Sequence, residues 1–98
     1  MSILQIASNQ RIAQNEGNLV SNMDGEKVML SIKSGKYYNL GSTGGRIWEL
    51  IETPATLQQI VETLSAEYEI EASVCEEQVR TFLTSLSKEG LIQIREEL

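Results

Sequence analysis

The spacing of apolar residues changes once along the chain, near residue 40, and this change limits the folds open to it. Before it, Val28, Leu30 and Ile32 recur at every second position, which is typical of a strand with one face toward the core and one toward water. The opposite face of this segment carries Lys27, Met29, Ser31 and Lys33. After residue 40, apolar residues recur every three or four positions, as on amphipathic helices. The pattern predicts strands first and helices second.

Two glycine-containing turns divide the first part into three strands. Asp24-Gly25 separates "NLVSNM" from "EKVMLSIK", and Ser34-Gly35 separates the latter from "KYYNL". Asp-Gly is a preferred two-residue hairpin turn because both positions tolerate positive φ, and Ser-Gly is a weaker form of the same signal. A three-stranded antiparallel meander follows from this spacing.

The third strand of the meander contains two adjacent tyrosines. Alternation places Tyr38 and Leu40 on one face, where they pack on the core, and Tyr37 and Asn39 on the other. The local sequence offers this strand no further partner. An edge strand with unpaired N–H and C=O groups can accept an extended peptide as an additional strand.

The first predicted helix covers residues 42–51, and Pro54 prevents its extension. The second begins at a capping-box pair, Thr56 with Gln59. Its apolar stripe is formed by Leu57, Ile60, Val61, Leu64 and Tyr68.

The third predicted helix begins at a second capping-box pair, Ser73 with Glu76, and ends at Gly90 in a left-handed C-cap. "LIQI" then returns as a short strand. The predicted fold is α+β, a winged helix-turn-helix with an N-terminal three-stranded antiparallel sheet, three helices and a short C-terminal strand. Residues 18–98 form the predicted domain, and residues 1–17 are expected to be a mobile N-terminal segment or an extra strand.

The residue inventory excludes most catalytic chemistry for this chain alone. It has 98 residues, no histidine and one cysteine, so neither a histidine general base nor a Cys–His pair nor a zinc site can form. Cys75 is interpreted as a small apolar residue in the first turn of the third helix. We expect no catalytic residue, no metal site, no cofactor and no enzymatic activity.

Charge is unevenly distributed along the chain. Residues 1–46 hold five basic and three acidic side chains, whereas residues 47–98 hold three basic and eleven acidic ones. Nucleic-acid binding depends on cationic side chains, so the acidic helical half argues against DNA, RNA and anionic membranes as partners. The chain contains no run of five consecutive apolar residues, which excludes a transmembrane helix. The N-terminus has no signal-peptide pattern, so a cytoplasmic location is expected.

Several motifs in fixed order give the chain a family resemblance. They are the Gly-x-Tyr-Tyr-x-Leu strand, the Gly-x-x-Ile-Trp-x-Leu helix, the "TLQQIVETL" helix and the terminal Leu-x-x-x-Gly-Leu-Ile of residues 86–92. Together they resemble the PqqD family over about residues 18–95. Gly41-Ser42 departs from the residues that many relatives carry after the leucine, and this difference affects the turn alone.

The resemblance implies a peptide-recognition element of a pathway that makes ribosomally synthesised and post-translationally modified peptides (RiPPs). Such domains bind the leader segment of a precursor peptide along the third strand and beside the third helix. Carried onto this sequence, the peptide-binding positions are Lys36, Tyr37, Tyr38, Asn39, Leu40, Cys75, Gln78, Val79 and Phe82. The chain looks most like the stand-alone leader-binding protein of split lasso-peptide systems, whose partner is a cysteine-protease-like leader peptidase.

Three alternatives remain open at the level of sequence. Other members of the family serve radical SAM enzymes, and the sequence does not separate these subclasses. A winged-helix DNA-binding regulator needs a basic recognition helix, but the third helix offers Arg80 and Lys88 against three glutamates. A purely structural subunit of an enzyme complex is the third possibility.

Overall fold

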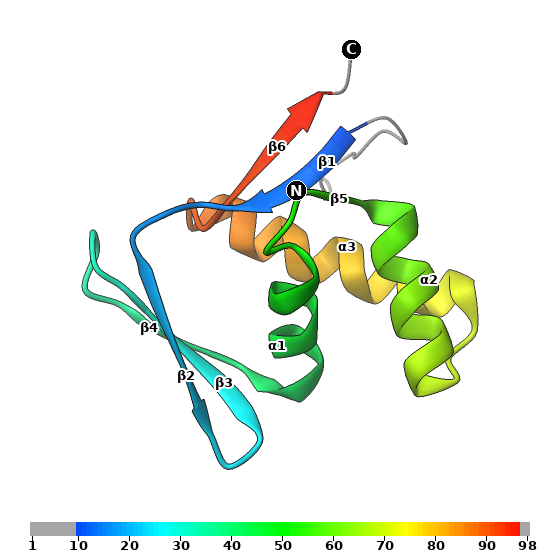
Figure 1. Cartoon of the computed structure of the whole chain (residues 1–98), viewed down its shortest axis with the longest axis horizontal. Coiled ribbons are helices and arrows are strands. Elements are labelled where there is room, and N and C mark those ends of the chain that lie inside the picture. Colours follow the sequence, from blue (N-terminus) through cyan, green and yellow to red (C-terminus); the bar gives the residue numbers. More distant parts are fainter. Residues whose placement is uncertain (1–9, 97–98) are drawn as a thin grey trace.

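The junction predicted near residue 40 is the boundary between a strand and a helix in the computed structural model, which describes residues 10–96 (Figure 1). The strands are β1 (Gln10–Gln14), β2 (Asn18–Met23), β3 (Glu26–Ser31), β4 (Tyr37–Leu40), β5 (Ala55–Thr56) and β6 (Ile92–Glu96). The helices are α1 (Gly41–Leu50), α2 (Leu57–Tyr68) and α3 (Ala72–Lys88). The predicted α+β architecture, with a meander, three helices and a C-terminal strand, is confirmed.

The meander pairs β2 with β3 and β3 with β4, all antiparallel. Its first turn is the predicted Asp24-Gly25, with φ of 55° and 83°, the left-handed values that these two residue types tolerate. The second turn is longer than predicted. β3 ends at Ser31, and residues 32–36 form the connection, in which Gly35 donates its N–H to the carbonyl of Ser31 at 2.7 Å. Ser34-Gly35 is therefore not a two-residue turn.

The prediction of which face of β3 meets the core was wrong. Met29 is fully buried and Ser31 is buried, whereas Ile32, just beyond the strand, is 60% exposed. The reason is Lys27, whose aliphatic stem lies against Gly45 of α1 while its ammonium pairs with Glu49 at 2.9 Å. A lysine that packs by its stem makes the inner face look polar in the sequence.

A second sheet, of order β5-β1-β6, was not predicted as such. β1 pairs antiparallel with the predicted C-terminal strand and with β5, and its Ile12 is fully buried in the core. Part of the 1–17 segment is thus an extra strand, one of the two expectations stated for it. Residues 1–9 lie outside the described residues.

The helix boundaries agree with the sequence except at the start of α3. Thr56 and Gln59 form the predicted reciprocal capping box of α2. The box predicted at Ser73 is absent, because α3 begins at Ala72 with Glu71 as its N-cap, two residues earlier than predicted, and the Ser73 hydroxyl donates to the Glu71 carboxylate at 2.9 Å. Gly90 has φ of 73° and ends the helix as predicted, with the N–H of Leu91 bonded back to the carbonyl of Leu86.

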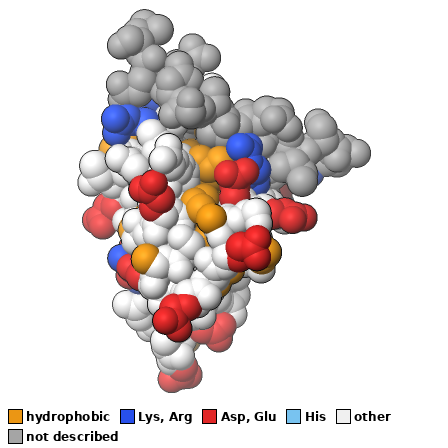
Figure 2. Space-filling model, turned by 90° about the vertical axis from the view of Figure 1, so that its right-hand side faces the viewer, with side chains coloured by type: hydrophobic (Ala, Val, Ile, Leu, Met, Phe, Trp, Pro, Cys, Tyr) orange, Lys and Arg blue, Asp and Glu red, His pale blue; other side chains and the backbone are white. Residues whose placement is uncertain are grey.

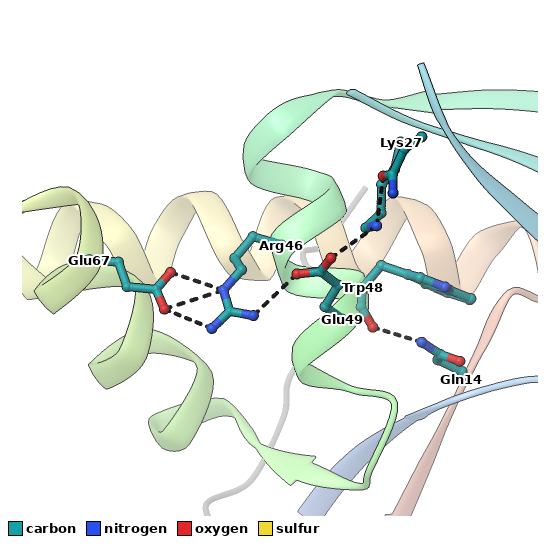
Figure 3. Close-up of polar contacts among 7 residues, drawn as sticks. Gln14, Lys27, Arg46, Trp48, Glu49 and Glu67 are labelled. Carbon is teal, nitrogen blue, oxygen red and sulfur yellow. Dashed lines mark hydrogen bonds and ion pairs between the residues drawn. The ribbon is translucent and has the colours of Figure 1, made fainter. Parts of the chain in front are cut away.

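Arg46 of α1 forms an ion pair with Glu67 of α2 and so links these two helices (Figure 3). Its guanidinium donates to both carboxylate oxygens of Glu67 on α2, with a shortest N···O distance of 2.7 Å, and also to Glu49 within α1. Glu49 in turn accepts the ion pair from Lys27 of β3. This network, which we call the Arg46 clamp, links β3, α1 and α2 and so fixes the meander relative to the helices.

The Arg46 clamp makes stability depend on pH. Hydrogen bonds from Arg46 lower the pKa of Glu67 below its ordinary 4.5, so the pair stabilises the fold above that pH and is lost as the pH falls through the depressed pKa. We expect Glu67→Gln to melt below the wild type at about pH 7, with the gap closing as the pH falls through the depressed pKa of Glu67. Thermal melts followed by circular dichroism measure this, and Glu52→Gln, an exposed carboxylate outside the clamp, should show no such gap. A gap that stayed constant with pH would contradict the ion-pair account.

Candidate functional site

The backbone of β4 is open on one side, since β3 is its only neighbour in the sheet among the described residues. The N–H of Ser31 donates to the carbonyl of Lys36 at 2.9 Å, so these two residues form a hydrogen-bonded pair. Hydrogen-bonded and non-bonded pairs alternate in an antiparallel ladder. The pair Leu30–Tyr37 is therefore non-bonded, and the pair Met29–Tyr38 is the next hydrogen-bonded one. The backbone groups of Tyr37 and Asn39 therefore point to the open side.

The side chains of β4 divide between two faces as predicted. Tyr37 is 74% exposed on the outer face, whereas Tyr38 packs against the core and Leu40 is buried. Asn39 is exposed, and its side-chain oxygen accepts the N–H of Gly41 at 2.9 Å, which fixes the turn into α1.

The inward face of β4 is joined to the end of α3. The Tyr38 hydroxyl donates to Oε1 of Glu89 at 2.8 Å, and Nζ of Lys36 lies 3.7 Å from the same oxygen. The hydrogen bond to Glu89 raises the pKa of Tyr38. These contacts distinguish the two edges of the meander: β4 is the edge that lies beside α3.

An apolar cavity of about 130 Å³ lies among the three helices, and Gly44 in its wall is close to Leu40 at the end of β4. Its wall from α3 consists of Cys75, Gln78, Val79 and Phe82, the four helix positions named from the sequence. The other walls come from Gly44 and Ile47 of α1 and from Leu64 and Tyr68 of α2. We call this space the helical cavity.

A shallow surface groove continues from the helical cavity along α3. Gln78 and Phe82 line both spaces, so the two are contiguous. The groove is completed by Val74, Glu77, Thr81 and Ser85. Val74 is 45% exposed, which leaves an aliphatic side chain uncovered at one end of the groove.

The floor of the helical cavity is closely packed, because α1 and α3 approach each other at Gly44. Cys75 and Val79 are almost fully buried, and burial raises the pKa of the Cys75 thiol, which disfavours the reactive thiolate. A Cβ built on Gly44 would lie 2.8 Å from two ring atoms of Phe82 and 3.5 Å from Cβ of Leu40. β4, α1 and α3 therefore meet at this glycine.

The described part of the site offers an open strand edge and an apolar wall as binding surfaces. Within residues 10–96, no cluster of three or more His, Cys, Asp or Glu side chains could hold a metal ion. None of the helices over those residues is both long and apolar enough to span a membrane. Figure 2 shows Asp and Glu side chains scattered over the side of the molecule turned toward the viewer, with a narrow strip of hydrophobic side chains between them.

Several residues of the site were not named from the sequence. Gly44 lies inside α1, within the range predicted for the first helix, and a glycine inside a helical pattern is the signal of a close approach. Tyr68 was assigned to the apolar stripe of α2 and instead lines the helical cavity with 42% of its surface exposed. The sequence did not indicate Val74, Thr81 or Ser85 as site residues, because an exposed residue in a groove has the same sequence pattern as any other surface residue.

Residues 26–92, more than half of the chain, match the family described as coenzyme PQQ synthesis protein D (PqqD). The chain belongs to the PqqD family. The resemblance stated from the sequence motifs is thus confirmed. Curated proteins give no match to the chain.

Solved structures share this fold. TbiB1 in complex with the TbiA(beta) leader peptide is 30% identical, with a TM-score of 0.76 over 83% of this chain and 94% of that chain. A lasso peptide synthetase B1 complexed with the leader peptide is 24% identical, with a TM-score of 0.74 over 84% and 96% of the two chains.

A third structure is the PqqD truncation of Methylobacterium extorquens PqqCD, representing a functional, stand-alone RiPP recognition element. It is 15% identical, with a TM-score of 0.77 over 95% of this chain and 99% of that chain. At this identity, and at that of the lasso peptide synthetase, the likeness concerns the fold alone.

The contact at Gly44 gives a prediction on stability. Gly44→Ala should lower the free energy of unfolding by about 1–2 kcal/mol, because the added methyl group displaces the Phe82 ring. Alanine in an unobstructed helix position would instead stabilise by about 0.5–1 kcal/mol. Urea denaturation measures the difference, with Ser42→Ala, exposed in the same helix, as the control. A stabilised Gly44→Ala variant would show that Phe82 is not held against α1.

Proposed function

We propose that this PqqD-family protein is a non-catalytic adaptor that binds the leader of a ribosomally synthesised precursor peptide and delivers it to a leader peptidase of lasso-peptide biosynthesis. The observation that carries the proposal is the open edge of β4, which is joined to α3 at Glu89 and meets Phe82, a residue of the helical cavity and of the groove, at Gly44. TbiB1, with 30% identity, supports it, since that protein is in complex with a leader peptide.

Binding by strand addition would use both parts of the site. The backbone groups of Tyr37 and Asn39 supply the register of the guest strand, and its inward side chains enter the space between Lys36–Leu40 and α3. Cys75, Gln78, Val79 and Phe82 present an apolar wall to an aliphatic or aromatic anchor. Ordering a flexible leader offsets part of the gain, so a dissociation constant of about 1 μM is expected.

Delivery raises the local concentration of the precursor at an enzyme that supplies the chemistry. With no histidine in the chain and a buried Cys75, the peptide bond would be cleaved by the partner, a cysteine-protease-like peptidase. Because precursor peptides are made on ribosomes, we place the adaptor in the cytoplasm, without a cofactor.

An apolar row on the outer face of the meander supports a protein partner. Leu19 of β2 pairs with Leu30 of β3, which pairs with Tyr37 of β4, so the three side chains form one continuous row across the sheet. Leu19 is 58% exposed and Tyr37 is 74% exposed. A guest strand on β4 would extend this face, so a peptidase that covers the row would contact the adaptor and the leader together.

A radical SAM peptide-modifying enzyme is the alternative partner, since the leader-binding step is the same for both. Acidic residues oppose a DNA-binding role: Glu76 and Glu77 are exposed on α3, the helix that would enter the major groove. Gene neighbourhood distinguishes the two enzymes, through a transglutaminase-like protease gene or a radical SAM gene beside a short precursor gene.

Strand addition predicts a specific effect of proline on the β4 edge. Asn39→Pro removes an N–H that points to the open side, so affinity for the synthetic leader of the precursor encoded beside this chain should fall at least about tenfold. Asn39→Ala also loses the side-chain bond to Gly41 but keeps the N–H, and should bind within about threefold of the wild type. Isothermal titration calorimetry measures both. Equal affinities for the two variants would contradict strand addition at this edge.

The outer row predicts a separation of binding from cleavage. Leu19→Asp places a charge on the face proposed for the peptidase, while the β4 edge is left intact. Leader affinity should be unchanged, and the cleavage rate by the peptidase encoded in the same cluster should fall at least about tenfold. Gln58→Asp, on the helical side, is the matched charge control. Unimpaired cleavage by Leu19→Asp would remove this face from the delivery step.

A further inference from the structure

Glu89 lies where α3 ends and faces the inward side of β4. It is the C-cap residue of α3, and its Oε1 accepts the hydrogen bond from the Tyr38 hydroxyl at 2.8 Å while Lys36 lies 3.7 Å away. Lys36 and Tyr38 are two positions apart, so the alternation of the strand turns both to the same face. Two side chains of the proposed guest-binding strand thus converge on one carboxylate of the helix across the groove.

The carboxylate is mounted on fixed backbone. The N–H of Glu89 bonds to the carbonyl of Ser85 at 3.2 Å, and that of Leu91 bonds to Leu86 at 3.0 Å. The carbonyl of Gly90 accepts a hydrogen bond from the Asn15 side chain at 2.8 Å, which ties the end of α3 to the segment after β1. Motion of the Glu89 backbone would therefore require motion of the helix end.

The other end of the bond is also held. Tyr38 lies opposite Met29 in the ladder, and Met29 is fully buried. Toward the end of β4, Leu40 and Phe82 meet at Gly44. The strand is thus held against the helical layer at two points, a packed one near Gly44 and a hydrogen-bonded one at Glu89, and the separation of β4 from α3 is set between them.

We infer that Glu89 is a positioning residue for peptide binding, which acts through Tyr38 to hold the β4 edge at the distance from α3 that a guest strand requires. This inference rests on the proposed function and adds a residue that the peptide need not touch. The inference also assigns a different polarity to each end of the binding site. The end at Glu89 is polar and is occupied by Tyr38, so the apolar anchors of the peptide enter at the end formed by the helical cavity.

A double-mutant cycle tests the inference, with the synthetic leader of the precursor encoded beside this chain as the probe. Tyr38→Phe and Glu89→Ala should each weaken binding about fivefold, and the double variant should be no weaker than either single one, because both remove the same bond. Glu89→Gln keeps an acceptor oxygen and should bind within about twofold of the wild type. Glu52→Ala, an exposed carboxylate remote from the groove, should leave affinity unchanged.

The outcomes separate this inference from the proposed function. No binding by the wild-type protein would contradict leader recognition itself. Wild-type binding with full affinity in Tyr38→Phe, or with losses that multiply in the double variant, would overturn the role of Glu89 alone. A Glu89→Gln variant as weak as Glu89→Ala would also overturn it, since it would show that binding depends on the negative charge of Glu89 and not on the hydrogen bond from Tyr38.

Discussion

Among the described residues, the backbone of β4 has a strand partner on one side, and the other side is the open edge on which the proposed binding depends. Antiparallel pairing with β3 fixes which groups remain, so the N–H and C=O groups of Tyr37 and Asn39 face outward in register. Unpaired edges usually promote aggregation. Here the edge is short and is joined to the end of α3, where an added strand would find hydrogen bonds and an apolar wall together.

Three sets of contacts hold that edge in place. The Arg46 clamp joins β3 to α1 and α2, Gly44 allows α1 to pack closely on Phe82, and Glu89 reaches β4 from the end of α3. The first two sets hold β3 and the helices together, and the third contacts β4 itself. This arrangement gives a small domain a fixed groove without a metal or disulfide among its described residues.

The order of elements followed from the sequence because strand and helix periods differ and turn chemistry is local. Asp24-Gly25, the Thr56 capping box and Gly90 all behave as predicted. The face of β3 did not, since Lys27 covers α1 with its stem, a tertiary contact that residue polarity conceals. The second sheet was missed for a related reason: β1 gains its strand character from β6, about eighty residues away in the chain. The four α3 positions of the helical cavity came from family resemblance, and their meeting in one cavity could be seen only in three dimensions.

The most direct test of leader binding at this edge is amide hydrogen exchange by NMR, without and with the synthetic leader. The account predicts that the Tyr38 N–H, paired with β3, is protected in the free protein, whereas those of Tyr37 and Asn39 exchange rapidly and become protected when the leader binds. Binding that instead protects β2, the other edge of the meander, or neither edge, would contradict strand addition to β4.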